Sequence, residues 1–381
     1  MNHIKSLKLC LTFGLALFLT ACGERLESPI IQESSSSVSS QSGSSSAEAS
    51  SDEGEQFTDD THPPEAGMVR SLLTNEWITE EAAALRPIAV MTPNESAAIP
   101  HYNLSKASVI YEANVEGRMT RMLAIYEDWK DLDKIGNIRS LRTYYGFWAL
   151  EWDAFIVHWG GPFFINELID KPDVEHLDGA KGIDSSGFFR STDREDPHNS
   201  YASGPALKSL IQDKGYSLTD RGLKDPRHFQ FTSRSKPNTL EQYSDCQKAT
   251  LVDMSSCYPL TRCYFEYNEE DNLYYRYQHL SGTADGPHLD TVTGEQLTFS
   301  NLLVQYTKHE ELGEGYLAFQ CHDTTRDGWF FTNGKGIHVT WEKNSDFGAT
   351  RFYDDTGNEI TLNTGKTMIL IVEDGDSFHF E

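Results

Sequence analysis

Residues 262–381 carry short apolar runs separated by turn signals, and this pattern restricts the segment to a mainly β fold. The clearest runs are 302–306, 316–319, 336–341 and 368–372. Each has the length and the β-branched or aromatic content of a strand. Asn333-Gly334 between two of these runs is a two-residue hairpin turn signal. The sequence therefore predicts a mainly β C-terminal domain over residues 262–381.

Residues 77–225 mix strand-like and helix-like segments. Apolar runs of strand type lie at 87–91, 109–111 and 154–157, whereas 140–152 and 204–213 have helical spacing. Nearly 300 residues exceed what one ordinary core encloses, so two domains are expected. The prediction is an α+β fold, with a layered sheet-and-helix N-terminal domain over 77–225. An irregular connection over 226–261 joins it to the β domain.

The first 21 residues have the features of a secretory signal. Lys5 and Lys8 precede an apolar run at 9–19 that is too short to span a bilayer. The segment Leu19-Thr20-Ala21-Cys22 resembles a bacterial lipobox, in which cleavage leaves a lipidated cysteine at the N-terminus. The alternatives are an ordinary cleaved signal and an uncleaved helix. The expectation is an extracytoplasmic protein anchored to the cell membrane through lipid on Cys22.

Residues 22–76 are rich in serine and acidic residues and have few apolar side chains. Such a composition cannot bury enough surface to offset its ordering entropy, so a flexible tether is expected. The formal net charge of the whole chain is −26. This charge argues against nucleic acid as a partner and predicts repulsion from anionic lipid headgroups, so the lipid itself must hold the protein at the membrane.

Four cysteines lie outside the signal and the lipobox. An even number of cysteines in an exported chain favours two disulfides, for which three pairings are open. A zinc site and free thiols are the alternatives, but the sequence gaps fit no short metal-binding knuckle. The residues concerned are Cys246, Cys257, Cys263 and Cys321.

Longer motifs occur in order through both predicted domains. In the first domain they are 86–91, 111–121, 135–142, 153–161 and 197–199, and in the second 288–290, 293–297, 341–343 and 362–365. Together they resemble the YerB-like bacterial lipoproteins. Arg118 stands where that family favours a glycine, and Asn137 where it favours a proline. The resemblance implies a surface lipoprotein with a layered α+β first domain. It brings no established active site, because the family is defined by a domain of unknown function.

Residues 109–126 predict a hairpin that concentrates charged side chains. A two-residue turn at Gly117-Arg118 pairs Asn114 with Arg121 and Glu112 with Leu123. Alternation along the strands then puts Glu112, Asn114, Glu116 and Arg121 on one face, opposite an apolar face. We expect the charged face to point into the principal groove, because burying two carboxylates with one guanidinium is costly. Two interpretations of these charges are open: a functional site, and a structural network of ion pairs.

Further candidate residues follow the hairpin. Arg139 and Arg142 flank Ser140, an expected helix N-cap, and arginines at a helix N-terminus suit a carboxylate or phosphate. We expect these arginines to reach the second carboxylate of the hairpin. His158 precedes paired glycines, while His198 and Asn199 lie in a polar loop that suits a general base.

Two classes of function are compatible with these residues. The first is a binding or accessory module for a cell-wall glycan or an envelope protein, using Glu112, Asn114, Glu116, Arg121, Arg139, Arg142, His158, His198 and Asn199. The second is a cell-wall hydrolase or lyase, for which Glu112, Glu116 and His198 are the catalytic candidates. Glu112 and Glu116 are about 13 Å apart along a strand, which is too far for a two-carboxylate glycosidase site. No motif for a nucleophile, a metal or a cofactor is present, so neither metal nor cofactor is expected.

Overall fold

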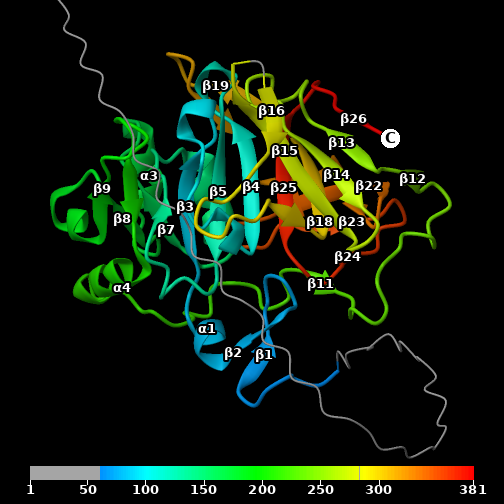
Figure 1. The fold of residues 1–381 in the computed structure, drawn as a ribbon, viewed down its shortest axis with the longest axis horizontal. Coiled ribbons are helices and arrows are strands. Elements are labelled where there is room, and N and C mark those ends of the chain that lie inside the picture. The colour runs from blue at the N-terminus through cyan, green and yellow to red at the C-terminus, as the bar shows by residue number, and fades with distance from the viewer. Residues whose placement is uncertain (1–60, 283) are drawn as a thin grey trace, which may run out of the picture. The chain divides into compact units, whose positions relative to one another are not determined.

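The computed structural model describes residues 61–282 and 284–381, and one large sheet runs through both predicted domains. The described residues form one compact unit. Eleven strands make up this main sheet (Figure 1). Across the sheet they are β12 (Gln247–Lys248), β22 (Lys335–Lys343), β21 (Asp323–Thr332), β18 (Asn301–Thr307), β25 (Thr367–Glu373), β4 (Val109–Asn114), β5 (Thr120–Tyr126), β3 (Ile88–Pro93), β7 (Phe155–His158) and β8 (His176–Asp178), with β23 (Arg351–Tyr353) beside β22.

The two parts of the chain meet where β4 pairs with β25. These strands run parallel, with Glu112 opposite Leu370. On the other side of β4 the hairpin partner β5 leads to β3, and every residue of β3, β4 and β5 is buried. Strands covered on both faces read as nearly continuous apolar runs, which is the pattern of these segments.

Each face of the main sheet is covered by a further layer. One face packs against a second sheet and against α4 (Gly204–Asp213), and the other against α2 (Thr143–Leu150) and α3 (Asn166–Ile169). In Figure 1 the second sheet lies in front of the main sheet, in yellow and green. Its strands are β16 (Ala284–Pro287), β15 (Leu273–Ser281), β14 (Tyr264–Asn268), β13 (Leu251–Asp253) and β26 (His379–Phe380), with β17 (Thr298–Phe299) beside β15.

Shorter elements complete the fold. Two-stranded pairs are formed by β1 (Met68–Arg70) with β2 (Trp77–Thr79), β11 (Gln230–Phe231) with β24 (Thr361–Leu362), and β19 (His309–Glu311) with β20 (Leu317–Phe319). A three-stranded sheet contains β6 (Ile135–Gly136), β10 (Ser200–Ala202) and β9 (Phe188–Arg190). The remaining helices are α1 (Glu80–Ala84) and the 3₁₀ turns Ser96–Ala98, Leu104–Lys106, Glu116–Arg118, Phe163–Ile165 and Gly182–Gly187.

The predicted α+β class with a β-rich C-terminal part is confirmed. The helix predicted at 204–213 has the same bounds in the structure. The Ser203 side chain accepts a hydrogen bond from the Ala206 amide, and Leu207 and Leu210 are buried. The expected irregular connection over 226–261 contains only β11, β12 and β13.

The last part of the stretch 22–76, for which a tether was expected, is folded in the structure. Residues 1–60 lie outside the described part of the chain, as do the predicted signal, Cys22 and most of the tether. From residue 68, however, β1 pairs with β2, and Leu73 is buried in the core. Asn75 also donates to the Thr364 hydroxyl at 2.8 Å. A few apolar residues are enough to fold this stretch onto the body of the protein.

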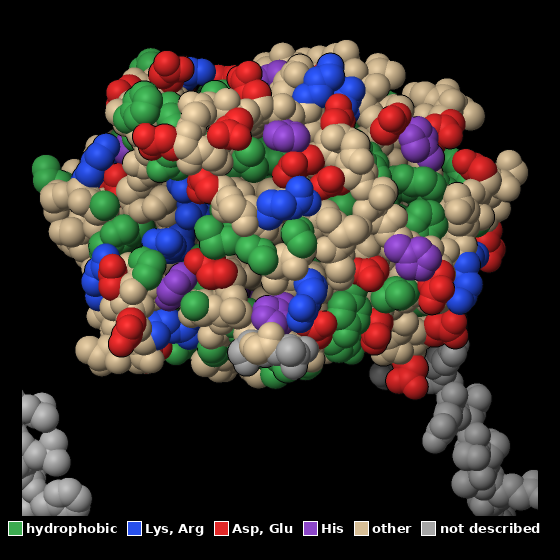
Figure 2. Space-filling model, turned by 90° about the horizontal axis from the view of Figure 1, so that it is seen from above, with side chains coloured by type: hydrophobic (Ala, Val, Ile, Leu, Met, Phe, Trp, Pro, Cys, Tyr) green, Lys and Arg blue, Asp and Glu red, His purple; other side chains and the backbone are tan. Residues whose placement is uncertain are grey.

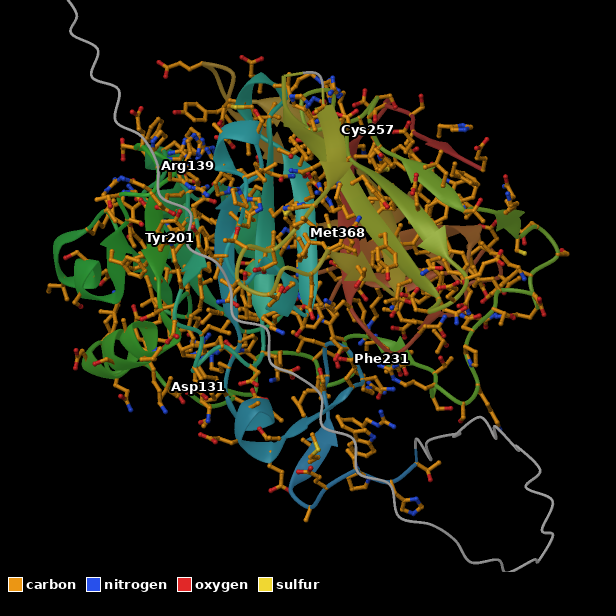
Figure 3. The ribbon with its side chains drawn as sticks, in the orientation of Figure 1. Asp131, Arg139, Tyr201, Phe231, Cys257 and Met368 are labelled. Atoms are coloured by element: carbon orange, nitrogen blue, oxygen red, sulfur yellow. The ribbon has the colours of Figure 1, made fainter. Side chains whose placement is uncertain are left out.

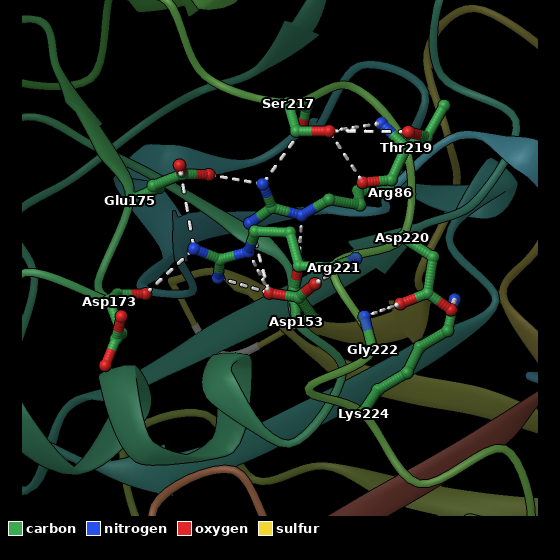
Figure 4. Close-up of polar contacts among 10 residues, drawn as sticks. All are labelled: Arg86, Asp153, Asp173, Glu175, Ser217, Thr219, Asp220, Arg221, Gly222 and Lys224. Carbon is green, nitrogen blue, oxygen red and sulfur yellow. Dashed lines mark hydrogen bonds and ion pairs between the residues drawn. The ribbon is translucent and has the colours of Figure 1, made fainter.

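A buried ion cluster fastens the chain that follows α4 to the N-terminal part (Figure 4). Arg86 and Asp153 are completely buried, with the guanidinium 3.2 Å from the carboxylate. Arg221 donates from Nε to the same carboxylate at 2.9 Å, and Glu175 pairs with both arginines. Because every charge in this cluster has a partner, its role is structural.

The two predicted disulfides are absent among the described residues, and this prediction is wrong. Cys246, Cys257, Cys263 and Cys321 are all free thiols. Cys257 and Cys263 pack in the core on one face of the main sheet, whereas Cys246 and Cys321 pack on the other. Cys257, Cys263 and Cys321 are buried and fill the core as small apolar side chains, whereas Cys246 is half-buried. Burial raises the pKa of the Cys257 thiol to about 12, so this thiol is protonated at neutral pH.

Candidate functional site

The candidate site lies at the carboxyl edge of the parallel strands. Strands β3, β4, β7 and β8 run in one direction, so their carboxyl ends meet at this edge. Ligands of open α/β sheets bind outside such ends. The segment that precedes α2 lies between the carboxyl ends of β3 and β7, beyond the residues through which these two strands pair. The Arg139 amide donates to Met91 at 2.9 Å, and the Leu141 amide donates to Gly160 at 3.0 Å.

Three arginines converge on this segment. Arg121 is the second residue of β5. Its guanidinium donates a hydrogen bond to the Ser140 carbonyl, and the residue is only 6% exposed. Arg142 is equally buried and grips Glu116 with two hydrogen bonds of 2.6 Å. Arg139 is half-buried, and its Nε has no hydrogen-bond partner within the described residues. The label of Arg139 in Figure 3 marks the site at the upper edge of the N-terminal part.

The cluster carries a surplus of positive charge. Glu116 is the carboxylate paired with Arg142, and neither Arg121 nor Arg139 forms an ion pair in the described part of the chain. Burial, followed by the charges of Arg142 and Arg139, lowers the pKa of Arg121 to about 10. Burial alone would raise the pKa of Glu116, but the hydrogen bond and charge of Arg142 outweigh it and keep this pKa below its usual value. Figure 2 views this edge from above and shows several basic side chains on its left half, interspersed with acidic and apolar ones.

The N-terminus of α2 adds backbone donors to the same place. The helix begins at Thr143, and its N-cap is Arg142, whose side chain makes no capping bond. The predicted cap at Ser140 is therefore wrong, because Ser140 lies in the extended segment before the helix. Uncapped amides at a helix N-terminus favour a negative charge. The arginines and the helix thus favour the same kind of ligand, an anion.

A groove lined with aromatic side chains opens beside the arginines. Its volume is about 360 Å³, and it is lined by Pro162, Phe163, Phe164, Leu312, Gly313, Glu314 and Tyr316. The Arg142 guanidinium lies 5.4 Å from the centre of the Tyr316 ring, and Phe164 meets that ring edge-on at 5.1 Å. Phe163 is 83% exposed. A large aromatic side chain held in solvent is a common feature of binding surfaces.

Sequence reasoning missed this groove. Phe163-Phe164 directly after Gly-Gly-Pro was a visible signal for an exposed aromatic pair. Tyr316 comes from the turn between β19 and β20, and nothing local in the sequence places it beside Arg142. The paired glycines have structural reasons: Gly160 adopts left-handed backbone with φ of 66°, and a Cβ on Gly161 would lie 2.4 Å from the Ile165 side chain and 3.1 Å from the Leu141 carbonyl oxygen.

The predicted register of the hairpin is wrong by one residue. The Val115 amide bonds to Met119, so the loop contains three residues rather than two. Gly117 and Arg118 both adopt left-handed backbone, with φ of 68° and 58°. A slip of one residue reverses the faces of a strand. Arg121 therefore shares a face with Ala113, while Glu112 and Asn114 lie on the opposite face of the sheet.

Glu112 and Asn114 are consequently on the other face of the sheet from the arginine cluster, and both are buried. Glu112 is completely buried and accepts hydrogen bonds from Asn94 at 2.6 Å and Arg276 at 2.9 Å. Asn114 is buried and donates to Glu373 at 2.8 Å. The expectation that the face of Glu112 and Asn114 points into a groove is wrong, because the second sheet covers it.

The predicted histidine candidates differ in their position. His158 is completely buried, donating from Nδ1 to the Gly160 carbonyl at 2.8 Å, with His176 at 3.1 Å from Nε2. His198 lies at the carboxyl edge, 3.6 Å from Glu95, and its Nδ1 has no partner in the described residues. Burial is the main reason why the pKa of His198 lies below its usual value. The charge of Glu95 opposes this shift, and the charges of Arg139 and Arg194 add to it. Asn199 accepts from Arg190 at 2.6 Å on the exposed side of the same loop.

Comparisons with known proteins agree with this architecture. The N-terminal domain model of the "Protein of unknown function (DUF3048)" family matches residues 73–217, and its C-terminal domain model matches residues 254–369. The chain belongs to this family. A relative in Bacillus subtilis (strain 168), named "Putative lipoprotein YerB", is 27% identical over 324 residues, covering 84% of this chain and 90% of the relative. The resemblance to YerB-like proteins expected from the motifs is thereby confirmed.

A solved structure supports the fold. The crystal structure of YerB from Bacillus subtilis matches with a TM-score of 0.68 at 24% identity, covering 82% of this chain and 99% of that structure. The two family domains correspond to the two halves of the main sheet, and the boundary between them lies in residues 218–253. Among the described residues, no helix is both long enough and apolar enough to cross a membrane.

Proposed function

We propose that this protein is a membrane-anchored envelope lipoprotein that binds an anionic cell-wall glycan at the carboxyl edge of its main sheet. The observation that carries the proposal is the arginine site itself. Arg121, Arg139 and Arg142 lie at an uncapped helix N-terminus, and among the described residues Arg142 alone of the three is paired with a carboxylate, that of Glu116. Lipid on Cys22, the lipobox cysteine, is the proposed anchor, and the name of the relative from Bacillus subtilis supports it.

The aromatic groove supports a glycan as the bearer of the anionic group. Rings such as Phe163, Phe164 and Tyr316 present flat apolar surface, which suits the apolar face of a sugar ring. Guanidinium groups bind carboxylates and phosphates through paired hydrogen bonds. A polymer of sugars with phosphate or carboxylate groups offers both features within one ligand.

The arrangement favours binding over hydrolysis. Both oxygens of Glu116 accept hydrogen bonds from Arg142, which keeps the carboxylate ionised and makes it a poor general acid. Glu112 is enclosed, and its partners Asn94, Thr120 and Arg276 occupy both of its oxygens. His198 faces the Glu95 carboxylate with its Nε2 at 3.6 Å, and its Nδ1 is buried without a hydrogen-bond partner among the described residues.

The test is sedimentation of the full-length protein, kept in detergent, with purified cell walls. Arg139→Ala should weaken wall binding about 10- to 100-fold, the value of one or two charge-assisted hydrogen bonds. Arg118→Ala is the matched control, because Arg118 is exposed and pairs with Asp376 instead. Phe163→Ala should also weaken binding while leaving the melting temperature unchanged, since this ring is exposed.

Two arms of the experiment separate the sources of the anion. Walls stripped of phosphodiester polymers with hydrofluoric acid retain the carboxylates of their peptides. Loss of binding on stripped walls identifies phosphate as the recognised group, and retained binding identifies carboxylate. Equal binding by wild type, Arg139→Ala and Phe163→Ala would contradict the proposed function.

A further inference from the structure

A pair of cavities lies at the amino edge of the main sheet, opposite the arginine site. One has a volume of about 400 Å³ and the other about 270 Å³, and Glu76 and Lys366 line both. Lys366 directly precedes β25, and residues 105–108 directly precede β4. In Figure 3 the label of Phe231, whose strand pairs with β24, marks this lower edge, and Arg139 marks the upper one.

Lys366 is the central feature of these cavities. Its ammonium group donates to the Ser105 carbonyl at 3.0 Å and forms no ion pair within the described residues. The charged groups around it are Glu76, Glu295, Asp290 and Lys106, all at longer range. Burial lowers the pKa of Lys366, and the charges of the nearby acids oppose this effect. Since none of these acids pairs directly with the ammonium group, a cation without a direct counter-ion faces the cavities. A half-buried ammonium of this kind is stabilised when a carboxylate binds to it.

The rest of the larger cavity offers uncharged hydrogen-bonding groups. The hydroxyls of Thr298 and Ser300 line it and make no hydrogen bond in the described structure. Asn272 accepts from Tyr267 through Oδ1 and Asn333 donates to Asn238 through Nδ2, which leaves one end of each amide available. Such groups suit the hydroxyl and amide substituents of a sugar.

The acidic residues at the rim limit the charge of a ligand. Glu76 and Asp271 line the same cavity, and Arg234 at its mouth is paired with Glu76 at 2.5 Å. A ligand with a single carboxylate gains the contact with Lys366. A multiply charged anion also meets repulsion from Asp271, which forms no ion pair within the described residues.

From this arrangement we propose that the cavities at Lys366 form a second binding site, for a monocarboxylate sugar. The carboxylate of the ligand pairs with the Lys366 ammonium, and its hydroxyl and amide groups bond to Thr298, Ser300 and the asparagine side chains. The site is independent of the arginine cluster, which lies at the other edge of the sheet. Its occupant differs in class from the anionic polymer proposed there.

Two sugars that differ by a lactyl ether group, which bears the carboxylate, provide the probe. N-acetylmuramic acid carries a lactyl carboxylate on the ring of N-acetylglucosamine. Calorimetric titration of the full-length protein in detergent should show at least tenfold tighter binding of N-acetylmuramic acid. Lys366→Met should abolish this preference, and Lys308→Met, an exposed lysine beyond the opposite end of β18, should leave it unchanged.

A labelling experiment decides the matter if Lys366→Met fails to fold. Trace acetylation of the wild-type protein with acetic anhydride, read by mass spectrometry, should show Lys366 protected by N-acetylmuramic acid and unprotected by N-acetylglucosamine. Arg139→Ala should not alter this protection, which separates the second site from the proposed function. Equal affinity for the two sugars, no binding of either, or no protection of Lys366 would overturn the proposal.

Discussion

Glu112 and Arg276 form an ion pair in which the charged groups are 2.9 Å apart and both side chains are completely buried. Glu112 lies on β4 in the N-terminal domain of the family, and Arg276 lies on β15 in the C-terminal domain. The pair therefore joins the two sheets across the core.

A chain of hydrogen bonds extends from this ion pair and determines the protonation of two histidines. The Pro93 carbonyl can only accept, so His101 carries its proton on Nε2 and accepts on Nδ1 from His288, at 2.8 Å. His288 then accepts on its Nδ1 from Arg276. Both rings are neutral in this arrangement, and burial lowers the pKa of His101 to about 4.

Breaking the ion pair should strongly destabilise the protein. Arg276→Met leaves the Glu112 carboxylate buried without its counter-ion, which we expect to lower the free energy of unfolding by about 3–5 kcal/mol. Denaturant unfolding followed by tryptophan fluorescence measures this loss. The double variant Glu112→Gln, Arg276→Met should recover part of it, and Arg118→Ala at an exposed pair should cost less than about 1 kcal/mol. A small effect of Arg276→Met would show that the pair contributes little.

Buried neutral histidines should make the protein less stable in mild acid. His228 stacks on Trp152 with ring centres 3.6 Å apart, and burial lowers its pKa to about 4 despite the nearby Glu151. An unfolded histidine has a pKa of about 6.5. Between these two values the unfolded state binds more protons, so stability falls as the pH falls from about 6.5 to about 4.

The variant His228→Phe tests this pH dependence. Phenylalanine keeps a ring against Trp152 but removes one titrating group, so the slope of unfolding free energy against pH should decrease by up to about 1.4 kcal/mol per pH unit in this window. Denaturation midpoints measured from pH 7 to pH 4 give the slope. His379→Gln, at an exposed position, is the control and should leave it unchanged. An unaltered slope in His228→Phe would mean that His228 is not the titrating group.

Removing the carboxylate from the arginine site should strengthen anion binding. Glu116 competes with any ligand for Arg142, so Glu116→Gln increases the positive charge offered to an anion. We expect wall binding to tighten by about threefold to tenfold, since an ion pair of this partly buried kind is worth about 1 kcal/mol. Co-sedimentation measures the change, with Glu310→Gln on the exposed strand β19 as the control. Weaker binding by Glu116→Gln would indicate that Glu116 itself contacts the ligand.

Replacing the lipobox cysteine should release the protein from the membrane. Cys22→Ser removes the thiol that would carry the lipid, and the loss of several acyl chains, each worth about 0.8 kcal/mol per buried CH₂, eliminates stable anchoring. Fractionation of cells expressing the variant should then find the protein in the soluble fraction. Cys10→Ser, within the predicted signal, should leave it in the membrane fraction. Persistent membrane association of Cys22→Ser would reject the proposed anchor.

The local elements of this protein were predictable from the sequence because their signals are local. Ser203 followed by Pro205 and by apolar residues at helical spacing defined α4 with its observed bounds. The continuous apolar runs that became β3, β18 and β25 were recognisable as strands because both of their faces are buried. The ordered motifs also led to the family, and the family models confirm it.

The arrangement of side chains depended on contacts that no local pattern encodes. One additional residue in the turn, with Gly117 and Arg118 in left-handed backbone, separated Glu112 from Arg121 across the sheet. Tyr316 reached Arg142, and Arg276 reached Glu112, through pairing between segments more than 150 residues apart. The sequence alone thus determined the strands and the helix α4, while the tertiary structure decided which charges form buried pairs and which lie at an open edge of the sheet. The physical reason is that periodicity assigns a side chain to a face, but only the register and stacking of the sheets determine what lies opposite it.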